Sequence, residues 1–348
     1  MKNKMFSLWL LIAYYLLLTA YAFSQDIHFS QFPMAPLLQN PALAGANHDL
    51  QAIVNYKNQW SSVASPYRTG DLSFDMKLNK KKAKKGFLAG GINIFSDKAG
   101  DSQMGTTQGN LSLAYHIFLN NNNTLGGGLM GGFIQRKFDY SNLQWMNQYD
   151  GMNYNSGLPS GEPAGKNNFT FADFGGGVLW AYNKGEEYMT SNNQIKANAG
   201  ISVFHPQQAK YSFYSSGEKL YMKTVVHANV LYGIKNTNYA VVPGFMFYKQ
   251  GGAHELLIGS LIRCTLQESS KYTGYLKGAA LSLGAYYRNK DAIVPAILLE
   301  FSQYAIGISY DVNVSQLKTA SNGRGGLEIS LRFVNPNPFL YKSSPSFN

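Results

Sequence analysis

Apolar and polar side chains alternate with a period of two along much of this chain of 348 residues. Over residues 72–78, Leu, Phe, Met and Leu alternate with Ser, Asp and Lys, and the same pattern runs through 110–119, 195–203 and 327–333. Successive side chains of a β-strand point to opposite faces, so strict alternation at this length indicates strands with one apolar face. We therefore expect an all-β fold.

About fourteen segments have the length and pattern of strands that cross an outer membrane. The expected strands lie near 50–60, 67–78, 86–96, 106–119, 124–137, 168–182, 194–204, 221–235, 239–248, 253–266, 278–288, 292–302, 303–312 and 324–334. Pro243 and Pro295 fall inside two of them, and because proline cannot donate to a strand ladder we expect bulges there. The alternative is that these two strands, the ninth and the twelfth, begin later.

The spacing of the long linkers supports an even strand count. In bacterial barrels both termini are periplasmic, periplasmic turns are short and outer loops are long. The two longest linkers, near 138–167 and 205–220, are connections five and seven, and the linker near 313–323 is connection thirteen, so all three fall on the outer side. The run Lys80–Lys85 and the run Asn120–Asn123 are connections two and four, which places both in the periplasm.

Composition fits such a barrel better than a soluble enzyme. Charged residues make up only 14% of the chain, against about a quarter in typical soluble domains, and aromatic residues also make up 14%. A transmembrane barrel exposes half of each strand to lipid and places aromatic girdles at both interfaces. We predict a transmembrane antiparallel β-barrel of about fourteen strands, in which the net charge of +11 meets lipid headgroups or an acidic partner and not nucleic acid.

The chain opens with the features of an export signal. Lys2 and Lys4 precede an apolar run from Met5 to Ala20, and Ala20-Tyr21-Ala22 fits a small-x-small cleavage site. We expect a signal peptide at 1–22, cleaved after Ala22, with Ser24 as the alternative boundary. No later run is long enough for a transmembrane helix, so we expect the mature chain in the cell outer membrane.

The mature chain divides into three parts. Residues 23–48 contain Pro33, Pro36 and Pro41, which excludes a regular helix or a central strand, and we expect this irregular N-terminal segment to plug the barrel or pack in it. The barrel is expected at 49–334. A proline-containing C-terminal tail at 335–348 is expected to be an extended periplasmic segment.

Several short motifs, taken in order, resemble one known family. They are Gln25-Asp26, Phe29-Ser30-Gln31, Asn40-Pro41-Ala42-Leu43-Ala44-Gly45, Tyr56-Lys57-Asn58-Gln59-Trp60, Tyr287-Arg288-Asn289-Lys290-Asp291-Ala292-Ile293, Ser309-Tyr310-Asp311 and Glu328-Ile329-Ser330-Leu331. This order resembles the PorP/SprF family of the type IX secretion system across essentially the whole mature chain. Lys57 stands where the family usually has Arg, a change that keeps the charge but loses planar bidentate bonding.

The resemblance implies an outer-membrane component of type IX protein secretion. Its expected partners are an exported cargo protein, periplasmic proteins of the secretion apparatus and outer-membrane lipid. Members are expected to bind or anchor exported cell-surface proteins, such as gliding adhesins, without a covalent step. The alternative is an outer-membrane porin or small-solute channel, because a barrel of this size can leave a polar lumen.

Candidate partner-binding residues come from the motifs, the basic run and the long outer loop. They are Asn40, Pro41, Gly45, Tyr56, Lys57, Gln59, Trp60, Lys81, Lys84, Trp145, Tyr149, Arg288, Asp291 and Asp311. The aromatic residues of the opening have two compatible interpretations: they anchor the N-terminal segment inside the barrel mouth, or they form a docking surface.

The sequence gives little support for catalysis or cofactors. Gly126 to Gly131 satisfies the G-x-G-x-x-G pattern, but a dinucleotide site needs a helix directly afterwards, and here a strand pattern continues. No two of the six His residues stand four positions apart, and no Gly-x-Ser-x-Gly elbow appears, so we expect no metal, no cofactor and no enzyme activity. His116 and His227 are expected to point into a polar lumen.

Overall fold

The structure is a computed structural model. It describes residues 26–62, 65–78, 85–100, 102–139, 143–162, 167–185, 192–213, 217–268, 278–316 and 318–335. The predicted signal peptide, Lys81, Lys84 and the tail beyond Asn335 lie outside these residues.

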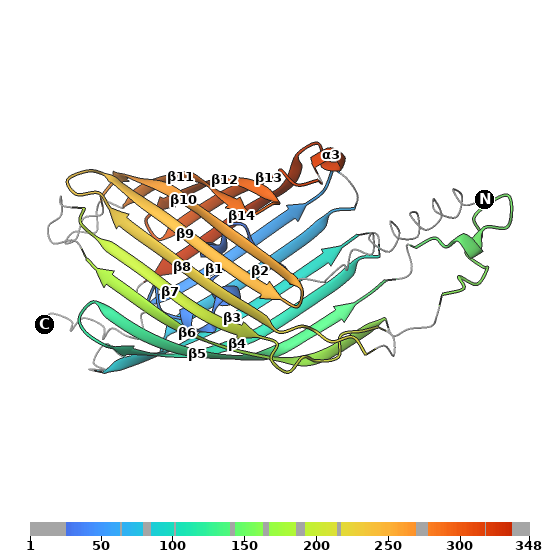
Figure 1. Cartoon of the computed structure of the whole chain (residues 1–348), viewed down its shortest axis with the longest axis horizontal. Helices are drawn as coiled ribbons and strands as arrows, with labels where there is room; N and C mark the ends of the chain where they lie inside the picture. Colours follow the sequence, from blue (N-terminus) through green and yellow to red (C-terminus); the bar gives the residue numbers. More distant parts are fainter. Residues whose placement is uncertain are drawn as a thin grey trace, which may run out of the picture.

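Fourteen antiparallel strands form one closed barrel, as predicted (Figure 1). Each strand pairs with its neighbours in the sequence, and β1 pairs with β14 to close the sheet. The strands are β1 (Leu50–Gln59), β2 (Tyr67–Lys77), β3 (Gly86–Ala99), β4 (Met104–Phe118), β5 (Asn123–Lys137), β6 (Asn168–Lys184), β7 (Ile195–Phe204), β8 (Lys223–Gly233), β9 (Tyr239–Gln250), β10 (Ala253–Gln267), β11 (Ala279–Arg288), β12 (Ala292–Phe301), β13 (Tyr304–Asn313) and β14 (Arg324–Asn335).

The two faces of β13 differ in polarity in the way a membrane barrel requires. Along β13, exposed and buried residues alternate without interruption. The exposed set includes Ile306 and Ile308, whereas the buried set includes Ser309 and Asp311. Along β13, apolar side chains therefore face outward and polar side chains face the lumen, the reverse of a soluble protein, which is the arrangement of a transmembrane β-barrel. Other strands also turn apolar side chains into the lumen, such as Val294 of β12, which lies in a buried cluster with Phe32.

The two ends of the barrel carry different connections. Leu50 at the start of β1 lies opposite Asn335 at the end of β14, so both barrel termini lie at one end, called here the terminal end. The two longest connections, between β5 and β6 and between β7 and β8, lie at the opposite, loop end, where η3 (Met146–Gln148) and α3 (Lys318–Ser321) also lie (Figure 1). By the general rule for bacterial barrels the terminal end faces the periplasm. None of the described helices is long and apolar enough to span a membrane.

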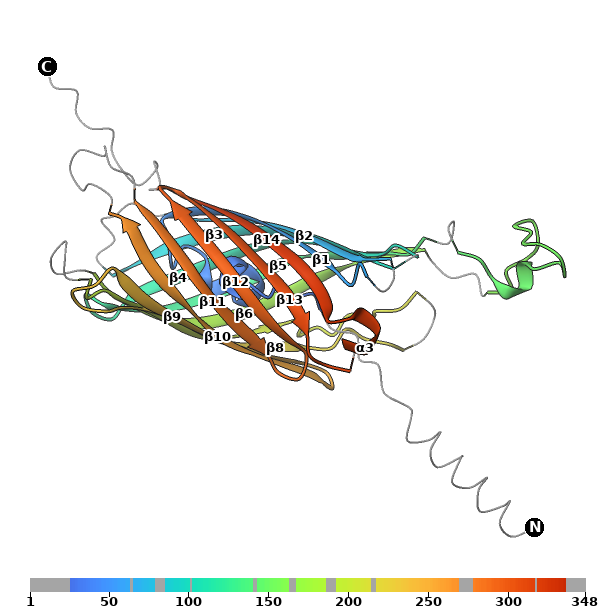
Figure 2. The same ribbon diagram turned by 90° about the horizontal axis from the view of Figure 1, so that it is seen from above.

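Residues 26–48, called here the luminal segment, lie inside the barrel (Figure 2). Its short elements are η1 (Phe32–Met34), α2 (Pro36–Gln39) and η2 (Pro41–Leu43), each with a proline in its first turn, where the missing N–H costs nothing. It begins at the loop end, where the Asp26 amide donates to Gln250, and reaches the terminal end where it enters β1.

The bulges expected at Pro243 and Pro295 do not occur. Pro243 pairs with Ser260, and Pro295 with Ala285, in continuous ladders. On the other edge of each strand the ladder skips the pairs beside the proline and resumes in the same register. A proline nitrogen points toward only one neighbouring strand, so the missing donor opens one ladder locally and no extra residue is needed.

Candidate functional site

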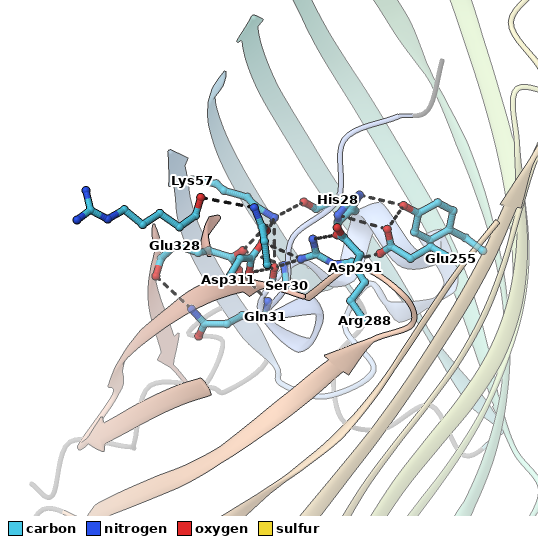
Figure 3. Close-up of polar contacts among 12 residues, drawn as sticks. His28, Ser30, Gln31, Lys57, Glu255, Arg288, Asp291, Asp311 and Glu328 are labelled. Atoms are coloured by element: carbon cyan, nitrogen blue, oxygen red, sulfur yellow. Dashed lines mark hydrogen bonds and ion pairs between the residues drawn. The ribbon is translucent and has the colours of Figure 1, made fainter. Parts of the chain in front are cut away.

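A buried network of charged side chains joins the luminal segment to the barrel wall. Figure 3 shows Ser30 surrounded by side chains from three strands, with Lys57 from β1, Arg288 from β11 and Asp311 from β13. The Ser30 hydroxyl donates to Asp311 at 2.7 Å and accepts from Lys57 at 3.2 Å and from the Arg288 guanidinium. One hydroxyl thus lies among three charged groups.

Glu328 of β14 holds the backbone of the same segment. Its two carboxylate oxygens accept from the amides of Ser30 and Gln31, each at 2.8 Å. Lys57 lies 3.9 Å from Glu328 and 3.4 Å from Asp311, and its ammonium also donates to the His28 carbonyl at 3.3 Å. Charge-assisted bonds of this kind are about twice as strong as neutral ones, so Glu328 fixes the position of the segment.

Arg288 is the centre of the network. Its guanidinium lies 2.8 Å from Asp311 and 2.8 Å from Asp291, and 3.6 Å from Glu255. The side chains of Arg288 and Asp311 are each only 1% exposed, as is that of Glu328. Removing one member of a buried pair leaves an uncompensated charge, which costs about 3–5 kcal/mol. We call the group Ser30, Lys57, Arg288, Asp311 and Glu328 the central network.

Asn40 attaches the middle of the luminal segment to β6. Its Oδ1 accepts from the Ala42 amide at 2.9 Å, which caps η2, while its Nδ2 donates to the Val178 carbonyl at 3.0 Å. Glycines give this part of the segment room: a Cβ on Gly128 would lie 2.4 Å from the Ala42 nitrogen. The G-x-G-x-x-G stretch is thus part of β5 and lets the wall approach the segment closely.

The wall near β1 holds the rest of the segment through polar side chains. Asp75 accepts from the Gly45 amide at 2.7 Å, and Asn55 donates to the Met34 carbonyl at 2.9 Å. Gly45 has φ +64° and a Cβ there would lie 2.6 Å from the Ala89 Cβ, so this turn requires glycine. His116 also faces the lumen, with its Nε2 2.9 Å from the Ala44 carbonyl.

A second charged cluster, the loop-end latch, holds the start of the segment. It consists of Asp26, Asp173, His205 and Lys223. His205 lies between two carboxylates, with Nδ1 2.6 Å from Asp173 and Nε2 2.8 Å from Asp26. Lys223 lies 3.5 Å from Asp26. Burial disfavours the imidazolium, but the two carboxylates outweigh it and raise the pKa of His205 to about 9.

Asp26 responds in the complementary direction. Burial alone would raise its pKa, but Lys223 and His205 outweigh that effect and lower the pKa of Asp26 well below its ordinary value. At neutral pH the latch therefore holds a carboxylate against an imidazolium. No group of His, Cys, Asp or Glu side chains among the described residues is arranged to hold a metal ion.

The structure places the sequence-predicted residues in four settings. Lys57, Arg288 and Asp311 belong to the central network, and Asp291 extends it at the surface, where its side chain is 37% exposed. Asn40, Pro41 and Gly45 are buried in the luminal segment. These positions have partners inside the barrel, and a docking role for them stays a prediction.

The remaining described candidates lie on the surface or at the loop end. Tyr56 faces outward and is 45% exposed. Gln59 ends β1, and Trp60 packs edge-to-face on Tyr67 with ring centroids 5.0 Å apart. Trp145 and Tyr149 flank η3 in the long β5–β6 connection.

Sequence reasoning did not select Ser30, Glu328 or the loop-end latch as site residues. Glu328 carried a usable signal, because it is an acidic residue between two apolar neighbours at a lumen-facing strand position. His205, which follows β7, carried no such signal, since its two carboxylate partners are 32 and 179 positions away.

A closed barrel with an apolar outer surface and a charged, filled lumen is an outer-membrane β-barrel, of the class whose lumen is occupied by its own chain. Its sequence matches the model of the type IX secretion system membrane protein PorP/SprF over residues 22–333. The chain belongs to the PorP/SprF family, and is thereby an outer-membrane component of type IX secretion.

Other comparisons add little to this assignment. No curated protein matches the chain. Similar solved structures include BamA from Haemophilus ducreyi lacking POTRA domains 1–3, with TM-score 0.41, 10% identity and coverage of 82% of this chain and 70% of that one. CdiB from Acinetobacter baumannii has TM-score 0.38 and 6% identity, covering 83% of this chain and 60% of that one. LpxR from Salmonella typhimurium has TM-score 0.34 and 8% identity, covering 82% and 100%.

Proposed function

We propose that this protein anchors exported cell-surface proteins, such as gliding adhesins, at the outer membrane and links them to the periplasmic secretion apparatus. It acts by binding, without a covalent step. The observation that carries this proposal is the occupied lumen: Phe32, Ala42 and Leu43 of the luminal segment are each no more than 2% exposed.

Two features of the lumen favour an anchor over a diffusion channel. The luminal segment is covalently continuous with β1, and it is held by the central network at one level and by the loop-end latch at another. Removing it from the lumen would leave Lys57, Arg288, Asp311 and Glu328 without the hydrogen bonds that they make to His28, Ser30 and Gln31. That free-energy cost opposes transient opening for solutes.

The loop end supplies a surface suited to cargo. In the β5–β6 connection Met146 is 91% exposed, Met152 86% and Tyr149 56%. The loop nevertheless has internal order, since Gln148 is buried and donates to the Leu158 carbonyl at 3.1 Å. Methionine and tyrosine side chains held out on an ordered loop are typical of binding surfaces.

The terminal end is the surface for the apparatus in this proposal. The basic run Lys80–Lys85 belongs to the connection between β2 and β3, which joins the strands at the terminal end. A concentrated positive charge there would attract an acidic periplasmic partner.

Planar-bilayer conductance separates the anchor from the porin. The purified protein is expected to show no steady open pore, since the luminal segment fills the barrel. A steady conductance of the wild-type protein would instead favour the small-solute channel.

A loop replacement tests the cargo surface. Residues 143–162 are replaced by a Gly-Ser linker of equal length, and the surface proteome is compared with that of the parent. We expect loss of one or a few exported proteins while the barrel still assembles. A double substitution of Met146 and Met152 by Ser is the finer variant, and unchanged surface proteins in both strains would contradict the proposed surface.

A further inference from the structure

A cavity of about 150 Å³ lies in the lumen between residues 31–34 of the luminal segment and the barrel wall. Gln31, Pro33 and Met34 of the segment border it on one side. The barrel side is formed mainly by apolar side chains, namely Leu231, Val242, Leu261, Tyr286, Ala296 and Leu298. The cavity is separate from the central network, which lies on the loop-end side.

Three charged side chains border the same cavity toward the terminal end. Glu300 lies between two arginines, with Arg263 Nε 2.6 Å from one carboxylate oxygen and Arg332 Nη2 3.0 Å from the other. The side chains of Arg263, Glu300 and Arg332 are 23%, 26% and 18% exposed, so this edge of the cavity meets solvent.

The charge of the triad Arg263, Glu300 and Arg332 is unbalanced. One carboxylate is shared by two guanidiniums, which leaves one positive charge at the cavity edge. The Nε of Arg332 is buried and has no hydrogen-bond partner. A buried guanidinium N–H without an acceptor costs free energy, and a guanidinium fork is built to pair with a planar carboxylate.

We propose that this cavity binds a carboxylic acid with an apolar group. The carboxylate of this ligand pairs with Arg332 and Arg263, and its apolar group fills the space between Met34 and the apolar side chains of the wall. The size fits, because an apolar cavity of about 150 Å³ accommodates a benzene-sized group. This ligand enters from the terminal end. The two sources of such a group are a free small acid and the C-terminus of a polypeptide that ends in an apolar residue.

The site does not depend on the proposed anchoring function. It uses different residues and a different level of the lumen. A protein that anchors cargo and one that does not would both carry it, so its test can fail while the secretion role stands.

The test uses the full-length protein in lipid nanodiscs and two fluorinated probes, 3-(4-fluorophenyl)propionate and the matching propanamide, followed by fluorine-19 NMR. We expect saturable binding of the acid and at least tenfold weaker binding of the amide. A tripeptide Gly-Gly-(4-fluoro-Phe), as free acid and as C-terminal amide, is the second arm: its binding as the acid identifies a polypeptide end, and binding of the propionate alone identifies a small acid.

Two variants locate the binding. Arg332→Gln removes half of the guanidinium pair, and Ala296→Leu fills the apolar part while leaving the triad intact; each is expected to weaken binding of the acid at least tenfold. Arg68→Gln, an equal charge change at an exposed position at the loop end, is the matched control and should bind as wild type. Equal binding of acid and amide, or wild-type binding by both cavity variants, would overturn the proposal.

Discussion

The hydroxyl of Ser30 donates a hydrogen bond to the carboxylate of Asp311 at 2.7 Å, joining positions 281 residues apart. Ser30 belongs to a motif near the start of the chain and Asp311 to a motif near its end. The fold brings them together because the luminal segment lies inside the barrel that the later strands close. This contact shows what motifs scattered along the sequence have in common: their residues meet where the luminal segment is bound to the barrel wall.

Replacing Arg288 by Met should loosen the luminal segment around Ser30. Asp311 would keep only Lys57 as a cationic partner in the described network, at a cost of about 3–5 kcal/mol. Hydrogen exchange of amides in residues 28–34 should rise by at least a hundredfold. Arg68→Met, at an exposed position, is the control and should leave exchange unchanged. Equal exchange in both variants would show that Arg288 does not hold the luminal segment.

The contacts of Lys57 predict how this position tolerates change. Its ammonium lies among four oxygens at 3.2–3.9 Å, from His28, Ser30, Asp311 and Glu328. A point charge satisfies this arrangement without a forked contact. Lys57→Arg should keep the protection of the luminal segment within about tenfold, while Lys57→Met should lose it as Arg288→Met does. Equal loss in both would mean that geometry, and not charge, holds the site.

Two adjacent glycines in β5 should differ in how much the same substitution destabilises the barrel. A Cβ on Gly128 would lie 2.4 Å from the backbone nitrogen of Ala42, whereas a Cβ on Gly127 would meet nothing within 4 Å. Gly128→Ala should therefore destabilise the barrel by about 1–3 kcal/mol through overpacking. Gly127→Ala should be close to neutral. Thermal unfolding of the two variants in parallel measures this, and a Gly128→Ala protein as stable as Gly127→Ala would show that the segment is not packed against β5.

The loop-end latch should weaken at alkaline pH. The folded pKa of His205 is raised from 6.5 to about 9, so its contribution is complete below pH 6.5, declines as pH rises, and is lost above about 9. The folded pKa of Asp26 is lowered, so the stability that Asp26 contributes is lost only when the pH becomes strongly acidic. Exchange of amides in residues 26–29, corrected for intrinsic rates, should therefore rise between pH 6.5 and 9.

His205→Gln is the control for that titration. It keeps a polar side chain but cannot carry the charge, so the rise between pH 6.5 and 9 should disappear. The same rise in this variant would assign the titration to a different group.

The strands were predictable because the membrane imposes a simple rule on them. Lipid on one side and polar partners on the other impose alternation along strands such as β13, and this alternation is visible in the sequence. The bulges expected at the two prolines were wrong for a local reason: whether a proline disturbs one ladder or two depends on which neighbour its nitrogen faces, as Pro243 shows.

The central network was predictable only in part. Lys57, Arg288 and Asp311 stood out as motif residues, but their common contact with Ser30 depends on where the luminal segment lies in three dimensions. The same limit applies to His205, whose position between Asp26 and Asp173 depends on the register of β6 and β7 and on the direction of the luminal segment.

The surface and culture-medium proteome of a clean deletion strain, compared with its parent and with a strain carrying the restored chain, tests the anchoring role most directly. We predict that one or a few large surface proteins are lost from the cell surface and return with the restored chain. Loss of all type IX exports would make the protein a core part of the apparatus instead of a cargo-specific anchor. An unchanged proteome, together with reduced uptake of small solutes, would contradict the account and favour a porin.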